Sequence, residues 1–204
     1  ISRKDIRNGD HVFVRRAGDV IPEIVSVNKK KRGQQTKKIV FPLQCPSCGS
    51  KIVRKEGESA AKCTGGNACP DQIKEGLKHF VSRNAFDIEG LGEKIIDQLL
   101  YSNLIKTTSD LFSLNIDELI SLERMAEKSS QNLLTSIESS KIISFERFIY
   151  AQGINDVGLA TSKSLAESFS SLEELINTEI EELLMIRDIG PIVANNILDF
   201  FKDI

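Results

Sequence analysis

A repeat in the second half of the sequence constrains the fold more than any other feature. With Gly92, Ala126, Gly158 and Gly190 taken as position zero, successive repeats lie 34, 32 and 32 residues apart. Apolar residues recur four positions before, one position before and seven positions after this point. They are Ile88, Leu122, Ile154 and Ile186; Leu91, Met125, Val157 and Ile189; and Leu99, Leu133, Leu165 and Ile197. Repeats of this length are supersecondary units that bury a core by packing on one another, so residues 73–204 are predicted to be helical.

Each repeat predicts two helices joined by a short turn that contains the glycine. The start of the second helix leaves backbone amides unpaired at the positive end of the helix dipole, where a phosphate oxygen fits. This pattern resembles the helix-hairpin-helix motif of DNA repair and replication proteins. Such a contact requires no Lys or Arg and carries little base-sequence information. The candidate DNA-contacting residues are Gly90, Leu91, Gly92, Arg124, Ala126, Val157, Gly158, Ile189 and Gly190.

The second repeat departs from the others because Ala126 stands where glycine is expected. If this position needs a left-handed backbone, alanine costs about 1–2 kcal/mol there. The second repeat is then either a packing unit or one in which Arg124 itself contacts phosphate. A helical array for protein contacts is the alternative interpretation of the whole repeat, although such arrays lack a regular glycine at the turn.

The four cysteines are grouped as two pairs. Cys45-Pro46-Ser47-Cys48 is followed after 14 residues by Cys63, and five more residues precede Cys69. This spacing is typical of a tetrahedral Zn²⁺ site, with Gly49 and Gly65-Gly66 allowing the bends. Four thiolates leave no position for an activated water, so the predicted zinc is structural. Disulfides and an iron–sulfur cluster are the alternatives.

The first 40 residues read as β structure. Strand-like residues surround a turn at Arg16-Ala17-Gly18-Asp19, and Pro22 belongs at an edge or a bulge because it lacks an amide donor. Two or three strands do not bury a core alone, which suggests a composite domain. Residues 29–35 are predicted to be a basic linker or loop. Arg15 and Arg16 are candidate phosphate contacts, with a solvated strand face as the alternative.

Between the cysteine pairs, residues 51–54 and 59–62 can form a hairpin around Glu56-Gly57. Its cations are interpreted as solvated charge, with DNA contacts as the alternative; they are Lys51, Arg54, Lys55 and Lys62. Helix starts are expected after Thr108-Ser109-Asp110 and after Ser170-Ser171. His79 is expected on a helix surface or in packing.

The net charge of −2 hides an asymmetry. Residues 1–80 hold 17 Lys/Arg and 8 Asp/Glu, whereas residues 81–204 hold 10 and 21. The basic first part suggests a polyanionic partner. No apolar stretch is long enough to span a bilayer, so no membrane partner is expected. Because the sequence starts at Ile1, we expect that it was taken from a longer protein.

The order of these segments, from β strands through a four-cysteine finger to four hairpins, resembles the middle-to-C-terminal part of bacterial NAD+-dependent DNA ligase. The stretches that carry the resemblance run from end to end. They are residues 16–22, Cys45-Pro46-Ser47-Cys48-Gly49-Ser50, Cys63-Thr64-Gly65-Gly66, residues 77–83, and Leu122-Glu123-Arg124-Met125. Ala126 departs from this family, in which glycine is usual.

The resemblance implies a mostly α chain with a small β part. Residues 1–40 would be the C-terminal part of an OB-fold, residues 41–72 the zinc finger, and residues 73–204 the helix-hairpin-helix domain. Ligases of this family adenylate a lysine with NAD+, pass AMP to the 5′ phosphate of a nick, and seal it with Mg²⁺. The Lys-x-Asp-Gly motif of that lysine is absent here. The chain is therefore expected to be inactive alone and to hold nicked duplex DNA for the adenylation domain.

The resemblance also implies a bacterial cytoplasmic location, a role in replication and repair, and missing adenylation and BRCT domains as partners. Two other function classes stay open. One is a non-catalytic helix-hairpin-helix protein that binds repair intermediates or junctions. The other is a protein–protein scaffold, which predicts no affinity for DNA.

Overall fold

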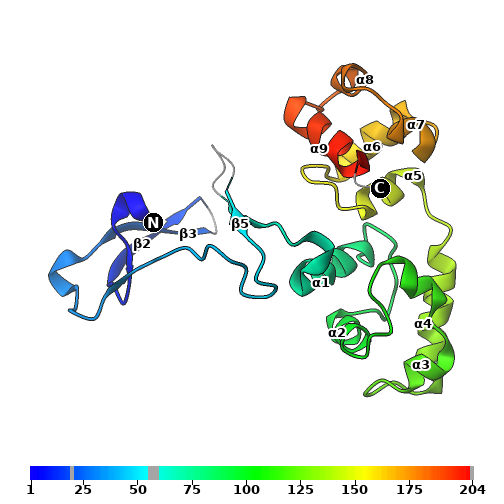
Figure 1. Ribbon diagram of the computed structural model, residues 1–204, viewed down its shortest axis with the longest axis horizontal. Coiled ribbons are helices and arrows are strands. Elements are labelled where there is room, and N and C mark those ends of the chain that lie inside the picture. The colour runs from blue at the N-terminus through cyan, green and yellow to red at the C-terminus, as the bar shows by residue number, and fades with distance from the viewer. Residues whose placement is uncertain (19–20, 55–59, 203–204) are drawn as a thin grey trace. The chain divides into compact units, whose positions relative to one another are not determined.

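The computed structural model describes residues 1–18, 21–54 and 60–202 (Figure 1). Contacts divide the chain into two compact units, Ile1–Thr64 and Gly65–Ile204. The first contains short strands and the second is helical, so the predicted mostly α chain with a small β part is confirmed. None of the helices in the described residues is long and apolar enough to cross a membrane.

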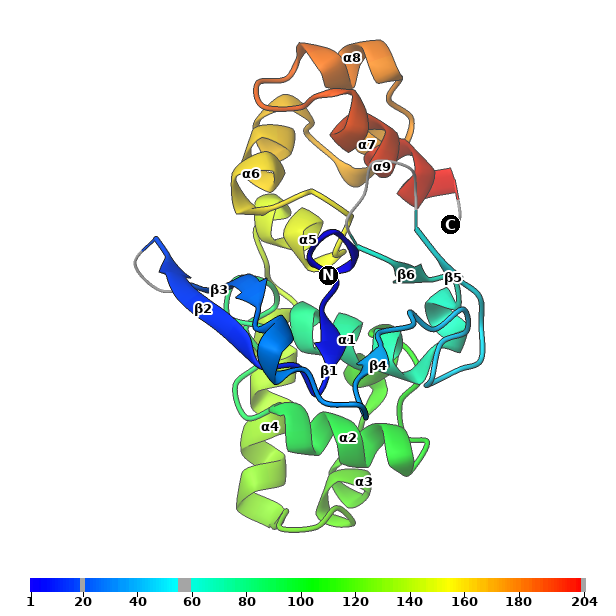
Figure 2. The same ribbon diagram turned by 90° about the vertical axis from the view of Figure 1, so that its left-hand side faces the viewer.

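The β part consists of paired short strands. Strand β2 (Val12–Ala17) pairs antiparallel with β3 (Ile21–Val27), and β1 (Arg7–Asn8) pairs with β4 (Lys37–Lys38). Figure 2 shows β2 and β3 as an extended ribbon. Pro22 lies opposite Arg16 in β3, which pairs with β2 alone in its sheet and so is an edge strand, as expected for a proline. Gly18 in the predicted turn is left-handed, at φ 62°, whereas Asp19 and Val20 lie outside the described residues.

The predicted basic linker or loop at residues 29–35 is a short 3-10 helix followed by a loop. It starts with the 3-10 helix η2 (Lys29–Lys31), and the next residue, Arg32, reaches across the fold. The Arg32 guanidinium lies 2.6 Å from an Asp5 carboxylate oxygen and 2.8 Å from an Asp10 oxygen. Asp10, whose side chain is only 1% exposed, also accepts the Arg7 backbone N–H at 2.8 Å. Arg32 therefore ties the loop after η2 to Asp5 and Asp10 near the start of the β region.

Acid is expected to loosen this network. Hydrogen bonds from Arg32 hold the pKa of Asp10 and the pKa of Asp5 below the ordinary carboxyl value, which is about 3.9. A depressed folded-state pKa stabilises the fold above the unfolded value and loses that contribution as pH falls through the folded value. The NMR signal of the Arg32 Nε–H group should therefore persist down to pH near 4 and fade below it. Asp10→Asn should fade at higher pH or show no signal; unchanged behaviour would contradict the network.

After the 3-10 helix η3 (Gly66–Ala68), the helical unit contains ten further helical segments in its described residues. They are α1 (Pro70–Phe80), α2 (Glu93–Tyr101), the 3-10 helix η4 (Ser109–Ser113), α3 (Ile116–Ile120), α4 (Glu127–Ser140), α5 (Phe145–Ala151), α6 (Leu159–Ser168), α7 (Leu172–Ile176), α8 (Ile180–Met185) and α9 (Pro191–Lys202). The second helix of the four repeats is α2, α4, α6 and α9 respectively. The predicted cap at Ser171 is confirmed, since its hydroxyl accepts the Glu174 N–H.

The helix start predicted after Thr108-Ser109-Asp110 takes a different form in the structure. The segment is a 3-10 helix, and no side-chain cap bond is recorded for Thr108. Instead, the Asp110 carboxylate accepts the backbone N–H groups of Lys106 and Thr107, each at 2.8 Å. The acidic residue closes the turn that precedes it, as Asp side chains do in loops.

Two apolar cores organise the repeats in pairs. The first and second repeats share a core that includes Leu91, Leu99 and Leu133, and the third and fourth share one that includes Leu165 and Ile197. All the apolar residues at position seven are at most 2% exposed. Helix α5 contributes Ala151 to the first core and Ile149 to the second. The repeats therefore form two hairpin pairs, defined by residues 77–137 and 149–201.

Two buried serine hydroxyls lie in these cores without a hydrogen-bond partner. Four residues after position zero, the repeats carry Ile96, Ser130, Ser162 and Ala194, all at most 1% exposed. The hydroxyls of Ser130 and Ser162 have no recorded partner. An unsatisfied buried hydroxyl costs about 1–3 kcal/mol, and the fourth repeat shows that alanine fits this position.

Ser162→Ala is therefore expected to stabilise the chain, by about 1 kcal/mol. Ser164→Ala on the same helix is the matched control, because the Ser164 hydroxyl is exposed and bonds the Ala160 carbonyl at 3.2 Å. It reports the gain from helix propensity alone. Urea unfolding of both variants would measure the difference, and a less stable Ser162→Ala would refute the argument.

Candidate metal centre and nucleic-acid interface

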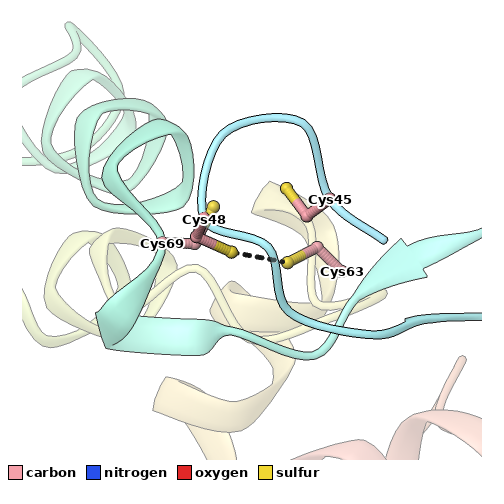
Figure 3. Close-up of side chains that lie close together, drawn as sticks. All are labelled: Cys45, Cys48, Cys63 and Cys69. Carbon is pink, nitrogen blue, oxygen red and sulfur yellow. Dashed lines mark hydrogen bonds between the residues drawn. The ribbon is translucent and has the colours of Figure 1, made fainter. Parts of the chain in front are cut away.

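The four cysteines converge on one point (Figure 3). Their sulfur atoms all lie within 4.8 Å of one another, and the Sγ atoms of Cys48 and Cys63 are 3.5 Å apart. A tetrahedral zinc with Zn–S bonds of about 2.3 Å requires sulfurs about 3.8 Å apart. The donor set and the spacing therefore fit a structural Zn²⁺ held by Cys45, Cys48, Cys63 and Cys69.

Local backbone geometry brings the sulfurs together. In the first knuckle, Gly49 is left-handed at φ 74°, its N–H bonds the Cys45 carbonyl at 2.8 Å, and the Cys45 N–H bonds the Ser50 carbonyl. Strands β5 (Ile52–Val53) and β6 (Lys62–Cys63) pair antiparallel and carry Cys63 back to the knuckle. The predicted hairpin is confirmed in its strands, while its turn at Glu56-Gly57 lies outside the described residues.

The last cysteine joins the finger to the first helix. After the 3-10 helix η3 (Gly66–Ala68), in which Gly66 is left-handed, Cys69 is the N-cap residue of α1 and is 1% exposed. Its carbonyl accepts the Ile73 N–H at 3.0 Å. The N-terminal end of a helix favours the negative charge of a thiolate. Metal binding and the start of α1 are thus linked through one residue.

All four hairpins make the same turn. In each turn, the N–H of the residue at position −1 donates to the carbonyl of the residue at position −4. These bonds are Leu91 to Ile88, Met125 to Leu122, Val157 to Ile154, and Ile189 to Ile186, at 3.1–3.4 Å. The third residue of each turn is left-handed; these residues are Gly90, Arg124, Asp156 and Asp188, with φ between 62° and 86°. The strained position thus lies two residues before position zero.

The condition under which Ala126 would be strained, a left-handed backbone, is therefore not met. Ala126 is extended, at φ −129° and ψ 168°, and so are Gly92 and Gly158. Any residue adopts this conformation, so alanine has no backbone penalty there. The left-handed residue of the second repeat is Arg124 instead. Its side chain is 82% exposed and lies 3.4 Å from a Glu123 carboxylate oxygen.

Position zero caps the second helix of every repeat through its carbonyl. The carbonyls of Gly92, Ala126, Gly158 and Gly190 accept the N–H four residues on, at 2.9–3.1 Å. A Cβ added at any of the three glycines would meet nothing within 4 Å. The fold itself gives no reason for glycine at these places. Close approach of an outside group to the backbone is a reason that the geometry leaves available.

Side-chain amides fasten two of the turns. Gln98 on α2 donates to the Glu123 carbonyl and accepts the Glu123 N–H at 2.6 Å. Asn196 on α9 donates to the Asn155 carbonyl at 3.2 Å and to the Asp156 carboxylate at 2.8 Å. Gln98 and Asn196 both lie six residues after position zero in their repeats. Each hairpin pair is thus locked by an amide that one repeat extends to the turn of the other. The recurrence of apolar residues in the repeats did not reveal Gln98 and Asn196, because these two residues are polar and differ in type.

The candidate arginines of the β region are not equivalent. Arg15 lies opposite Glu23, whose carboxylate is 3.0 Å away, and Lys4 contacts the same carboxylate at 3.3 Å. No ion pair is recorded for Arg16 among the described residues. Neighbouring residues of a strand point to opposite faces, so Arg15 and Arg16 cannot both face one duplex from this strand.

The finger cations and His79 have structural neighbours. Arg54 lies over the Phe41 ring, 4.9 Å from its centroid, while Lys55 falls outside the described residues. The Nε2 atom of His79 lies 2.7 Å from the Tyr150 carbonyl oxygen, and the two rings are 4.6 Å apart. His79 is thus a packing residue between α1 and α5, as expected.

Comparison with protein families gives four matches in chain order. Residues 1–36 match the OB-fold domain and residues 44–70 the C4 zinc finger domain of NAD-dependent DNA ligases. Residues 83–139 match a SAM-like helix-hairpin-helix tandem, and residues 147–204 match a helix-hairpin-helix motif. The fold, the cysteine site and the hairpins thus define a DNA-binding chain of the helix-hairpin-helix class. The chain belongs to the NAD-dependent DNA ligase family, as the resemblance of its motifs implied.

Proposed function

We propose that this chain is the DNA-holding part of an enzyme that seals nicks in duplex DNA during replication and repair. The single observation that carries the proposal is the row of glycines at the helix starts. Gly92, Gly158 and Gly190 have N–H groups with no recorded partner in the described part of the chain, and open space where a Cβ would lie. Phosphate oxygens of the duplex backbone are the ligands that suit such amides.

Sealing itself would use groups outside these residues. The lysine that NAD+ adenylates, the Mg²⁺ ions and the remaining domains of the family are proposed for the complete enzyme, in the bacterial cytoplasm. The proposed parts of this chain are an OB-fold end at residues 1–40, the finger at 41–72 and the hairpins at 73–204. The hairpins would grip backbone phosphates, and Arg16 would add a contact from the β region.

Binding of the zinc-loaded chain to nicked and intact duplexes, measured by fluorescence anisotropy across a salt series, tests the proposal. Affinity should fall with salt, with a log–log slope of about −0.9 for each phosphate that a Lys or Arg neutralises. Gly158→Ala should weaken binding several-fold, because the added Cβ stands where the phosphate would approach, while leaving unfolding unchanged, because alanine fits the fold at Ala126. Gly33→Ala is the matched control, since Gly33 also has open space where a Cβ would lie but belongs to no hairpin.

The absence of binding at low salt would contradict the proposal and favour a protein scaffold. A junction-binding protein is the other candidate. It predicts a preference for branched over nicked duplex in the same assay.

A further inference from the structure

The second hairpin differs from the other three in a hydroxyl group. The Ser129 Oγ accepts the backbone N–H of Ala126 at 2.9 Å and donates to the Ala126 carbonyl at 2.8 Å. This N–H is the group at position zero that the other hairpins leave without a recorded partner. The place that a phosphate oxygen would take is therefore already filled by an oxygen of the chain.

The other repeats lack this arrangement. At the same position, three residues after position zero, they carry Ile95, Thr161 and Val193. Two of these side chains have no hydroxyl. No hydrogen bond is recorded between the Thr161 hydroxyl and Gly158. Among the described residues, the second repeat is thus the one in which a side-chain oxygen bonds the N–H at position zero.

The turn of the same hairpin is closed as well. The Gln98 side-chain oxygen accepts the Glu123 N–H, and the Gln98 side-chain nitrogen donates to the Glu123 carbonyl. Both backbone groups of Glu123 are therefore already bonded. Gln98 lies on α2, the helix that begins at Gly92. The second hairpin thereby holds the helix whose N-terminal end carries the open amide of the first hairpin.

We propose that Ser129 closes the second hairpin as a phosphate site, so that the duplex is gripped by three hairpin amide sites and the second hairpin positions the first. The inference rests on the proposed function, because it divides the hairpins of a DNA clamp into those that grip and one that supports. It also moves the cause of the difference from Ala126 to Ser129. Ala126→Gly alone should leave DNA affinity unchanged, since the hydroxyl stays in place.

The unaltered chain supplies the first test. The zinc-loaded protein, labelled with ¹⁵N at glycine and alanine, would be titrated with a nicked duplex, and the backbone amide signals followed by NMR. The amides of Gly92, Gly158 and Gly190 should shift, whereas that of Ala126 should not. An Ala126 shift as large as those of the glycines would overturn the inference. If none of these amides moves, the proposed function fails, which is a different outcome.

Opening the hairpin supplies the second test. Ser129→Val places at this position the residue that the fourth repeat carries, and it frees the Ala126 amide. The Ala126 signal should then respond to the duplex, and the affinity for the duplex should rise several-fold because one more amide bonds a phosphate oxygen. Thr135→Val is the matched control on α4, because the Thr135 hydroxyl bonds the Gln131 carbonyl and is far from the turn in sequence. An Ala126 signal that stays unchanged by the duplex in the Ser129→Val variant would count against the inference.

Discussion

Removal of zinc by a strong chelator is expected to unfold residues 44–70 while leaving most of the helical signal. The strands of the finger are two residues long and its only large apolar side chains in residues 44–70 are Ile52 and the exposed Val53, so the fold has little else to hold it. A structural zinc site contributes on the order of 10 kcal/mol to such a segment. The two helical cores contain no cysteine and should persist, although the start of α1 at Cys69 should fray. Zinc release measured with a chromogenic chelator, together with NMR signals of the finger, would follow the change.

Cys48→Ser should reproduce the effect without a chelator, since one of the four thiolates is lost. Ser47→Ala is the matched control, because Ser47 is an exposed residue within the same knuckle. Release of zinc without any change in the finger signals would show that the metal does not hold the fold. A finger that stays folded in Cys48→Ser would lead to the same conclusion.

Leu165→Ala is expected to destabilise the second hairpin pair by about 2–5 kcal/mol. Leu165 is fully buried in the core that the third and fourth repeats share. Its removal leaves a cavity that the surrounding helices fill only in part. Leu159→Ala on the same helix is the control, because Leu159 is 51% exposed and should cost less than about 1 kcal/mol. Urea unfolding followed by circular dichroism compares the two, and equal costs would contradict the assignment of this core.

The zinc site and the hairpins could be predicted from the sequence because both rest on local spacing. Ligand spacing in a knuckle and the recurrence of apolar residues leave marks that need no tertiary information. The apolar positions at seven residues after position zero are all buried, as the pattern requires. The parts of the chain that were predicted correctly are those in which neighbours in sequence are also neighbours in space.

The contacts between distant polar residues could not be predicted in this way. Arg32 stands in a run of lysines, and only the fold brings it to Asp5 and Asp10. The left-handed turn position was missed because its residues are Gly90, Arg124, Asp156 and Asp188, which share no apolar or glycine pattern. The two aspartates were the available signal, since Asp tolerates a left-handed backbone better than most residues.

Helix α5 has a mechanical consequence for the two hairpin pairs. Its seven residues place Ile149 in one core and Ala151 in the other, while His79 and the Arg83 carbonyl contact Tyr150 and Arg147 on the same helix. Because α5 contributes side chains to both cores, a rotation of α5 would move both cores together. Under the proposed function, the seven residues of α5 would thus set the spacing between the phosphate sites of the two hairpin pairs, and a change there would alter the length of duplex that the chain contacts.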